Sequence, residues 1–579
     1  MDGITALVDF SDPSQPGAPR LRHAFGTPLR TLVAHTQEQV RPLLDAVQAA
    51  SDQGQWCVGY LQYEAAPAFD AALAVHAADG PLAWFAVFDK PLPWPEAAVG
   101  TAQIDWQSFI ARADFDAAMA TLLQAIADGE LYQVNLTAQM QGRFSGAPQA
   151  LFAALQRAQP GGYAAFIDTG HTGNMQILSV SPELFFDWRG GNILARPMKG
   201  TARRGTTEDE DAALAAALRS SSKERAENVM IVDLLRNDVS RIAEPFSVQV
   251  PRLFHTEALP TVWQMTSDVS ARTRAGCSLA EVFAALFPCG SVTGAPKVQA
   301  MRKIQSLEPS ARGVYCGAIG VVQPGGTSTF NVPIRTVTLR GTHAQCGIGS
   351  GITADASAEG EWQEWANKQA FVQRASAPFA LLETLALVDG RLRNRAEHLA
   401  RMAQAAAHFG TPWNPEHVAH TLDTLIASHP HNDWRVRLLL DAQGHATAEA
   451  YALEASPARV RLQLADRPLA EAYGEFVRFK TTRRAHYDAF TTPPGIFDTL
   501  LWNPAGEITE CTRGNIALLL DGRWVTPPLA CGLLGGIGRA VALREGRLVE
   551  AMVRVDDLPR VQAFAFVNSL RGWIAADLV

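Results

Sequence analysis

The chain has 579 residues, of which 47% are hydrophobic and 19% charged, so it carries enough apolar material for buried cores and is not a wholly disordered polymer. Its 50 basic and 58 acidic side chains give a formal net charge of −8, which supplies no overall attraction for nucleic acid or for an anionic membrane. No apolar run approaches the roughly 18 residues of a membrane span, and the first residues lack the basic and apolar regions of a signal peptide. Seven scattered cysteines without a CxxC pair predict a cytoplasmic protein rather than a disulfide or zinc framework.

The predicted elements alternate between helices and strands, which indicates a mixed α+β chain. Proline-rich residues 10–20 and 89–98 predict loops. In chain order, Ala/Leu-rich patterns and β-branched runs predict a helix over 114–128, a strand over 176–180, a helix over 209–219, a strand over 317–322 and a helix over 359–373.

The sequence predicts one domain boundary, within residues 371–379 (FVQRASAPF), because a proline biases the residue before it away from the helix. A strand follows and ends in Val388-Asp389-Gly390, a turn typical of a β-hairpin. We therefore predict two modules, residues 1–375 and 376–579, and divide the first into an N-terminal region (1–110) and a core (111–375).

Two acidic pairs and one lysine are the candidate chemical groups of the first module. Glu224 and Glu227, and likewise Glu361 and Glu364, are spaced i,i+3 on predicted helices, so each pair shares a helix face. Such a pair is commonly a solvated surface, but the first pair runs into an apolar stretch, where carboxylates would need a partner such as Mg²⁺. Lys199 precedes a glycine and reads as a turn residue unless desolvation or nearby positive charge makes it a nucleophile.

Residues 56–375 resemble the chorismate-utilising enzymes, and among them the aminodeoxychorismate synthase component I branch. The matching segments, in chain order, are VGYLQYEAA (58–66), ELYQVNLT (130–137), SPELF (181–185), RPMKGT (196–201), ENVMIVDLLRNDVSRI (227–242), GSVTGAPK (290–297), RGVYCGAIG (312–320), NVPIRT (331–336) and GIGSGITADASAEGEWQEWANK (347–368). The resemblance implies an α+β module in which two antiparallel sheets face each other and helices flank them.

The resemblance also implies residue roles. Glu183 would be the general acid for the departing 4-hydroxyl of chorismate, which requires a carboxyl that burial keeps protonated near neutral pH. Thr201 would contact the ring end of the substrate, and Arg335 is a natural fork for a carboxylate. The metal cage for Mg²⁺ would be Glu224, Glu227, Glu361 and Glu364. The enolpyruvyl side chain would be held by Thr293, Tyr315, Arg335 and the backbone of Gly349, Ser350 and Gly351.

Lys199 distinguishes the branches of this family. The resemblance implies that anthranilate-forming relatives carry a small residue in PIAGT, whereas aminodeoxychorismate synthases carry Lys in PIKGT. That Lys attacks C2 of chorismate and expels the 4-hydroxyl, after which ammonia adds at C4 and displaces it. Water-adding relatives carry Lys where this chain has Gln133, and a neutral amide is a poor base. The competing interpretation is that Lys199 only pairs with nearby carboxylates.

Two positions depart from the family pattern, and one activity is missing. Met198 replaces the usual Ile, a nearly volume-conserving change that we expect to be silent. Gln264 replaces a His that many relatives carry, which weakens the anthranilate alternative and leaves the role of Gln264 open. None of the seven cysteines stands in the GxCxG setting of a glutamine amidotransferase nucleophile. The chain should therefore take ammonia from a separate glutaminase subunit or use free ammonia.

The second module contains another lysine in a basic segment, FVRFKTTRRAHYD (476–488), which alone reads as a solvated or anion-attracting edge. Lys480 lies in this segment and Glu510 ends a strand-like run thirty residues later. Arg401 lies on a predicted helix. A glycine-rich turn, PLACGLLGGIGRA (528–540), could offer backbone N–H groups to a phosphate.

These residues resemble fold-type IV pyridoxal-phosphate enzymes, close to aminodeoxychorismate lyase, and the resemblance implies a two-subdomain α/β module. Lys480 would hold pyridoxal phosphate covalently and remove the C4 proton of the substrate. Glu510 would keep the pyridine nitrogen protonated, and Thr384 would lie near the substrate. The phosphate would be held by Arg401, Ser569 and the turn at Gly536, Ile537 and Gly538. Relatives of this type are commonly dimers, so a homodimer through this module is possible.

The second module also departs from its relatives. The lead-in before the first strand is shorter, and the turn reads GLLGGIGR where relatives have GLLPGITR. Gly538 therefore lacks a threonine hydroxyl, and we hypothesise a lower affinity for the cofactor.

Together the modules predict two consecutive steps of 4-aminobenzoate synthesis, in the folate pathway. One alternative is an anthranilate synthase component fused to a branched-chain or D-amino-acid type aminotransferase. Another is a regulatory binding protein in which one or both sites are inactive.

Overall fold

The computed structural model describes residues 3–13, 18–95, 102–107, 110–203, 208–258, 262–376, 379–469 and 471–579. The chain divides into two compact units, Met1–Pro378 and Phe379–Val579. Among the described residues, none of the helices combines the length and the apolar character that a membrane crossing requires.

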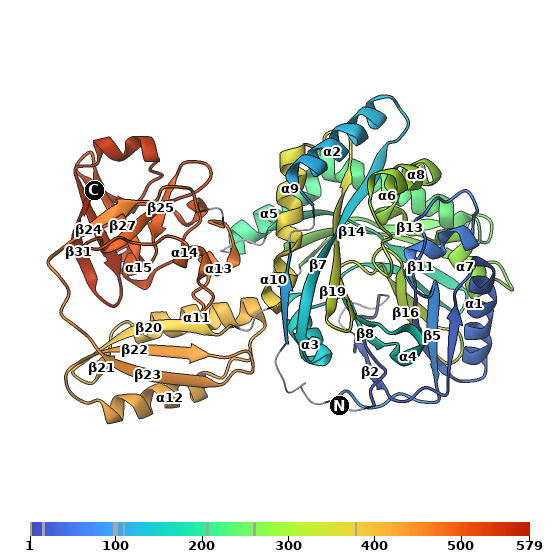
Figure 1. The fold of residues 1–579 in the computed structure, drawn as a ribbon, viewed down its shortest axis with the longest axis horizontal. Coiled ribbons are helices and arrows are strands. Elements are labelled where there is room, and N and C mark those ends of the chain that lie inside the picture. Colours follow the sequence, from blue (N-terminus) through green and yellow to red (C-terminus); the bar gives the residue numbers. More distant parts are fainter. Residues whose placement is uncertain are drawn as a thin grey trace. The chain divides into compact units, whose positions relative to one another are not determined.

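The first unit contains two sheets, and their paired strands run antiparallel throughout the described residues (Figure 1). The first sheet has the order β15 (Gly294–Ala295), β7 (Gln133–Gly146), β19 (His343–Ile352), β18 (Thr336–Arg340), β9 (Gln176–Ser181), β8 (Tyr163–Asp168), β1 (Ala6–Phe10) and β2 (Leu21–Phe25), with β6 (Ala102–Trp106) also paired to β7. The second has the order β12 (Met198–Arg203), β14 (Val262–Arg272), β11 (Asn192–Arg196), β10 (Leu184–Arg189), β17 (Ser328–Asn331), β16 (Ala318–Val322), β4 (Trp56–Leu61), β5 (Ala83–Phe88) and β3 (Arg30–Ala34), with β13 (Gln249–Ala258) also paired to β14.

The two sheets face each other, so the predicted architecture of this module is confirmed. Val8 and Phe10 of β1 share one core with Tyr60 of β4, Trp84 of β5 and Ile319 of β16. Strands turn alternate residues to opposite faces, so one set of side chains fills the space between the sheets and the other meets the helices.

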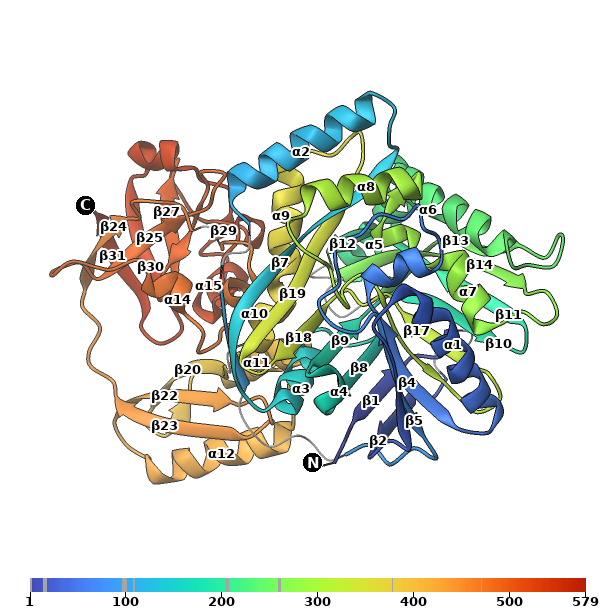
Figure 2. The ribbon, with the colours of Figure 1, turned by 45° about the vertical axis from the view of Figure 1, so that its right-hand side comes forward.

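Helices cover the outer faces of both sheets (Figure 2). Helices α3 (Pro148–Ala158), α8 (Lys297–Leu307) and α9 (Ala358–Lys368) contact the first sheet, and α1 (Gln37–Asp52), α5 (Glu208–Ser220) and α6 (Ser222–Ser240) contact the second. Helix α6 begins after Ser221 because the Ser221 hydroxyl accepts the N–H of Glu224. The remaining helices and turns are η1 (Tyr63–Ala68), α2 (Arg112–Ala127), α4 (Gly170–Gly173), α7 (Leu279–Leu286), η2 (Gly290–Val292) and α10 (Ala370–Ser376).

The second unit has two subdomains, each with its own sheet. The first subdomain has the strand order β21 (Arg391–Leu392), β20 (Leu381–Val388), β22 (Asp433–Leu440) and β23 (Ala446–Ala452), and α11 (Arg395–Phe409) and α12 (Pro415–Ser428) share its core. The second has the mixed order β26 (Ile508–Cys511), β25 (Asp498–Trp502), β24 (Arg459–Leu464), β31 (Gly572–Leu578), β30 (Ala563–Asn568), β27 (Asn515–Leu520), β28 (Arg523–Thr526) and β29 (Val549–Glu550). Its helices and turns are α13 (Glu475–Arg478), α14 (Ala485–Asp488), η3 (Leu529–Cys531), α15 (Ile537–Arg544) and η4 (Val555–Arg560).

The elements expected from the sequence agree with the structure except at one helix. Strands β20 and β21 form the predicted hairpin, and its turn residues Asp389 and Gly390 both have positive φ, as a two-residue hairpin turn requires. The helix expected over 359–373 is instead two helices, α9 and α10, separated at Gln369. Parts of the predicted loops and of the boundary, residues 14–17, 96–98 and 377–378, lie outside the described residues.

Candidate active sites

Lys199 lies on an irregular part of β12 at the end of the second sheet. Its Nζ atom is 4.0 Å from Oε2 of Glu227 on α6. A Cβ atom built on Gly351 of β19 would lie only 2.3 Å from the same Nζ. The absence of a side chain at Gly351 therefore leaves room for the ammonium group, and Lys199, Glu227 and Gly351 come together from three different elements.

Glu183 is buried near this lysine, just before β10. The hydroxyl of Ser291 donates to Glu183 Oε1 at 2.7 Å. Burial raises the pKa of Glu183 to about 7, against the opposing effects of the Ser291 bond and the charge of Lys199. A carboxyl with this pKa is partly protonated at neutral pH, as a general acid requires.

The first acidic pair lies on α6 next to Lys199. Burial raises the pKa of Glu224, and the neighbouring charge of Glu227 raises it further. Glu364, on α9, also raises the pKa of Glu224, so the carboxylates of the two helices act on one another electrostatically.

The second acidic pair is engaged with protein groups. Ser350 Oγ donates to Glu361 Oε2 at 2.5 Å, and Glu364 Oε1 is 2.6 Å from Lys368 Nζ. Among the described residues no group of three or more acidic, His or Cys side chains is close enough to bind a metal ion. The four glutamates of α6 and α9 still fit a hard cation in donor type and in charge, because a positive ion would relieve the mutual repulsion of their carboxylates.

Thr293 and Tyr315, both expected at the enolpyruvyl group, are buried in the same unit. Thr293 follows η2, and its carbonyl accepts the N–H of Asn135 on β7 at 2.8 Å. The ring of Tyr315 lies against Gly347, where an added Cβ would meet it at 2.2 Å.

Arg335 lies just before β18 and is half-buried. It has a positive φ of 53°, and it donates to the carbonyl of Lys368 at 2.9 Å and lies over the ring of Phe371. Burial lowers its pKa to about 10. Within the described part of the chain no carboxylate lies at ion-pair distance from it, so a substrate carboxylate would supply the missing charge.

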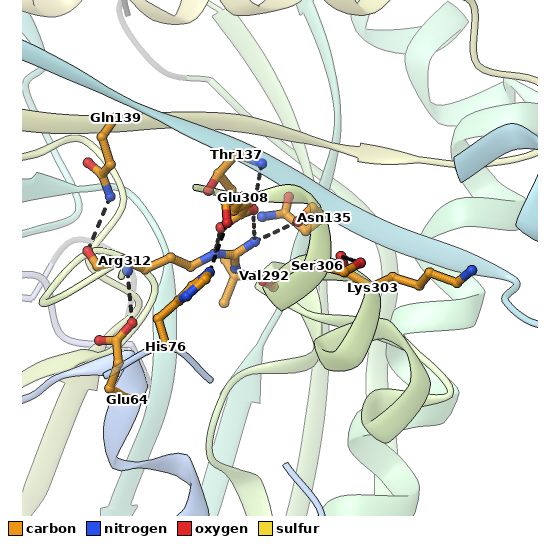
Figure 3. Close-up of polar contacts among 10 residues, drawn as sticks. All are labelled: Glu64, His76, Asn135, Thr137, Gln139, Val292, Lys303, Ser306, Glu308 and Arg312. Atoms are coloured by element: carbon orange, nitrogen blue, oxygen red, sulfur yellow. Dashed lines mark hydrogen bonds and ion pairs between the residues drawn. The ribbon is translucent and has the colours of Figure 1, made fainter. Parts of the chain in front are cut away.

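A buried polar network surrounds Arg312 and reaches Val292 of η2 and Asn135 of β7 (Figure 3). The Arg312 guanidinium pairs with Glu308 at 2.6 Å and donates to the carbonyls of Val292 and Asn135. Glu64 accepts the backbone N–H groups of Arg312 and Gly313. The network ties β7 to η2 and to the loop after α8, and sequence reasoning missed it although Arg312 begins one of the matching segments.

The two glutamines near Lys199 differ in their bonding. Gln264 Nε2 donates to the carbonyl of Gly200 at 2.9 Å, and its Oε1 accepts the hydroxyl of Thr201 at 3.1 Å. Thr201 is exposed, and its hydroxyl faces Gln264. Gln133 is fully buried, and neither side-chain polar atom has a protein partner. Its Nε2 would lie 2.9 Å from a Cβ at Gly351, so the amide borders the same space as Lys199.

The second unit contains a cavity of about 540 Å³ that collects nearly all the residues predicted for it. These are Thr384, Arg401, Lys480, Glu510, Gly536, Ile537 and Ser569. Gly538 does not line the cavity. A cavity of this size suits a cofactor and a small substrate together.

Lys480 and Glu510 are the buried titratable pair of this cavity. Burial lowers the pKa of Lys480 to about 8, and the charge of Arg401 lowers it as well. Burial raises the pKa of Glu510 to about 7. Tyr487 Oη donates to Glu510 Oε1 at 2.7 Å, and the Leu534 N–H donates to the same oxygen at 3.0 Å.

Arg401 is held rigidly at the other side of the cavity. Its Nε and Nη2 atoms donate to the two oxygens of Glu383 at 2.8 and 2.7 Å, and Nη1 donates to the carbonyl of Gly535 at 3.0 Å. Gly536 is the N-cap of α15, so a helix N-terminus borders the same cavity. A buried amine, a buried acid, an arginine and a helix start together fit pyridoxal phosphate, whose amine-reactive carbonyl, pyridine nitrogen and phosphate need those groups.

Gly538 packs closely against the turn that carries Ser569. A Cβ on Gly538 would lie 2.6 Å from the carbonyl carbon of Asn568 and 2.9 Å from the nitrogen of Ser569. Both are backbone atoms, so the chain has no room for a threonine there unless the 568–569 turn moves. Gly538 is a close-packing residue that lets the turn carrying Ser569 approach α15, and the missing hydroxyl follows from that packing.

Sequence reasoning missed most of the basic residues around this cavity. Of the basic segment, Lys480 and Arg484 line it, whereas Arg478 and Arg483 do not. The other basic residues that line the cavity are Arg435, Arg437, Arg513 and Arg571, and polar side chains that were also missed include Tyr451, Tyr487 and Asn515. Arg435 and Arg437 are spaced i,i+2 on β22, and this alternation was the available signal, because such residues share one face of a strand.

Comparisons with known proteins agree with the two-unit division. Residues 15–374 match the family described as chorismate binding enzyme, and residues 380–579 match amino-transferase class IV. Aminodeoxychorismate synthase component 1 of Klebsiella aerogenes is 39% identical over 289 residues, which cover 50% of this chain and 62% of that protein. Anthranilate synthase component 1 of Aquifex aeolicus is 36% identical over 271 residues, covering 47% of this chain and 54% of that protein.

One solved structure shares the fold of the first unit. Anthranilate synthase component I from Streptococcus pneumoniae matches with a TM-score of 0.54 and 25% identity, over 64% of this chain and 92% of that one. The chain spans only 62% and 64% of the length of two curated relatives, the Klebsiella aerogenes and Salmonella typhimurium synthase components.

Proposed function

The chain belongs to the chorismate binding enzymes, and we propose that its first unit converts chorismate and ammonia to 4-amino-4-deoxychorismate. We propose further that its second unit, of amino-transferase class IV, eliminates pyruvate from that product to give 4-aminobenzoate. The observation that carries the proposal is the half-buried amine of Lys199, which lies 4.0 Å from Glu227 and against the backbone of Gly351. A branch that forms anthranilate would need no amine at this point.

In the first step Lys199 attacks C2 of chorismate, and the 4-hydroxyl leaves as water with a proton from Glu183. Ammonia then adds at C4, and the C2 bond to Lys199 breaks. The pKa of Glu183, raised to about 7 by burial, supports its role as the acid. Arg335 would bind a carboxylate of the substrate, since it is a half-buried cation with no acidic partner in the described residues.

A magnesium ion would be held by the carboxylates of α6 and α9, Glu224, Glu227, Glu361 and Glu364. It would supply positive charge for a carboxylate of chorismate. Glu364 would have to give up part of its contact with Lys368, from which it is 2.6 Å away.

The nitrogen source is proposed to be ammonia, from solution or from a separate glutaminase. A glutaminase nucleophile is a cysteine with a lowered pKa. Burial instead raises the pKa of all seven cysteines of this chain, of which Cys277 is half-buried and the rest are buried.

In the second unit Lys480 would hold pyridoxal phosphate and remove the C4 proton of the bound substrate. Pyridoxal phosphate, when bound, supplies an electron sink conjugated with the substrate amine. Glu510 would keep a proton at the pyridine nitrogen, and Arg401 with the start of α15 would bind the phosphate. Release of pyruvate aromatises the ring, and this supplies much of the driving force.

The test is product analysis of the whole chain with chorismate and ammonium, with and without pyridoxal phosphate. We expect aminodeoxychorismate to accumulate without the cofactor and 4-aminobenzoate to form with it. Lys199→Ala should abolish the first product, and Lys480→Ala should leave aminodeoxychorismate unconsumed. Anthranilate as the main product, or an unchanged product from Lys199→Ala, would refute the proposal. Glutamine should replace ammonium only when a glutaminase is added.

A further inference from the structure

The segment that carries Lys199 is a β-bulge. Met198 pairs with Thr266 and Thr201 pairs with Gln264, so two residues of β12, Lys199 and Gly200, stand opposite a single residue of β14. Gly200 has a φ of 90°, in the region that favours glycine. A bulge re-aims the side chains of its strand, and here it determines the direction in which Lys199 leaves the sheet.

The bulge is closed on its helical side. A Cβ on Gly200 would lie 2.8 Å from Glu224 Oε2 and 3.3 Å from Leu218 Cδ1. Helices α5 and α6 therefore leave no room for the bulge to move toward them. The side chain of Gln264, on the neighbouring strand β14, also bonds this segment.

The amide of Gln264 bonds Gly200 of the bulge and Thr201, the paired residue that follows it. Its Nε2 donates to the carbonyl of Gly200, and its Oε1 accepts from the hydroxyl of Thr201. A bulge disrupts the ladder bonds of its strand, and the amide satisfies a carbonyl that the ladder would otherwise serve. A terminal amide presents donor and acceptor side by side, whereas the two nitrogens of an imidazole point away from each other.

We propose that Gln264 is a positioning residue that fixes the bulge and so directs Lys199 at the substrate. The inference rests on the function proposed for the first unit. It assigns a role to the position where relatives carry His, and it explains why this chain uses a side chain that can donate and accept at once. Gln264 acts through the backbone of Gly200 and not by contact with the substrate.

The experiment compares Gln264→Met and Gln264→Leu, which remove both bonds, with Thr266→Val, which removes a hydroxyl from the same strand without touching the bulge bonds. With chorismate and ammonium we expect kcat of the Gln264 variants to fall roughly 10- to 100-fold while KM changes less than about twofold. Thr266→Val should keep wild-type kcat.

An independent measurement tests how firmly the bulge holds Lys199, and it needs no catalytic turnover. In the full chain without substrate, the rate at which trinitrobenzenesulfonate modifies Lys199 is measured by mass spectrometry of its peptide. This rate should rise at least about threefold in the Gln264 variants and stay at the wild-type value in Thr266→Val. Equal labelling and equal kcat in all variants would overturn the inference. If the wild type makes no aminodeoxychorismate, the proposed function fails, and the labelling result still decides whether Gln264 holds Lys199.

Discussion

Replacing Gly538 with alanine would put a methyl group against the backbone of the turn that carries Ser569. The added carbon would lie 2.6 Å from the carbonyl carbon of Asn568, whereas ordinary contact begins at 3.4 Å, so the turn must move by roughly 0.8 Å. Overpacking of this kind costs about 1–3 kcal/mol. For a unit of about 200 residues each kcal/mol corresponds to about 2–4 °C, so the Tm of the second unit should fall by about 2–12 °C.

The same displacement should weaken cofactor binding, because Ser569 lines the cavity. Loss of one hydrogen bond to a charged group, about 1.5 kcal/mol, raises Kd roughly tenfold. The assay is calorimetric unfolding of the whole chain together with a titration of the cofactor-free protein with pyridoxal phosphate.

Gly535→Ala is the matched control, since a Cβ there meets only Leu529 Cδ2 at 3.8 Å, and it should leave Tm and Kd unchanged. The reasoning is refuted if Gly538→Ala keeps the wild-type Tm, or if Gly538→Thr binds the cofactor more tightly and also keeps the wild-type Tm.

Three further predictions concern buried charges. Burial lowers the pKa of Lys480 to about 8, so the fraction of its amine that is unprotonated rises from about one tenth at pH 7 to about nine tenths at pH 9. The rate at which the cofactor-free enzyme takes up pyridoxal phosphate should therefore rise about ninefold over this range and then level off. A continued rise to pH 10 would contradict this. Arg312→Ala leaves Glu308 without its ionic partner in the core and should lower the free energy of unfolding of the first unit by about 3–5 kcal/mol. Arg112→Ala, at the surface, should leave this free energy close to the wild-type value, and urea titration measures both. Burial raises the pKa of Glu64 from 4.5 to about 7, so the stabilising contribution of the protonated side chain is complete below pH 4.5 and is lost as the pH rises to 7. The free energy of unfolding of the wild type should fall over this pH range relative to that of Glu64→Gln. An equal slope of free energy against pH in both proteins would refute the prediction.

The sequence predicted best those features that depend on local pattern. The hairpin turn at Asp389-Gly390 follows from two adjacent residues, and Lys199, Lys480 and Glu510 stand in short segments with a recognisable order. The structure adds that Lys199 borders Glu227 and Gly351 and that Lys480 and Glu510 share one cavity.

The features that sequence reasoning missed depend on contacts between distant segments. The hypothesis about Gly538 considered only the lost hydroxyl, whereas the structure adds a steric constraint from Asn568, thirty residues away. The function of Gln264 is likewise visible only through its bonds to Gly200 and Thr201, sixty residues earlier. A single sequence without its fold gives no register between such segments.

Only four residues separate the last helix of the first unit, which ends at Ser376, from the first strand of the second, which begins at Leu381. A tether this short keeps each unit at a local concentration on the order of millimolar around the other, however dilute the protein becomes. Both units also come from one transcript in strictly equimolar amounts. A cell that makes this polypeptide therefore cannot produce the first unit in excess of the second.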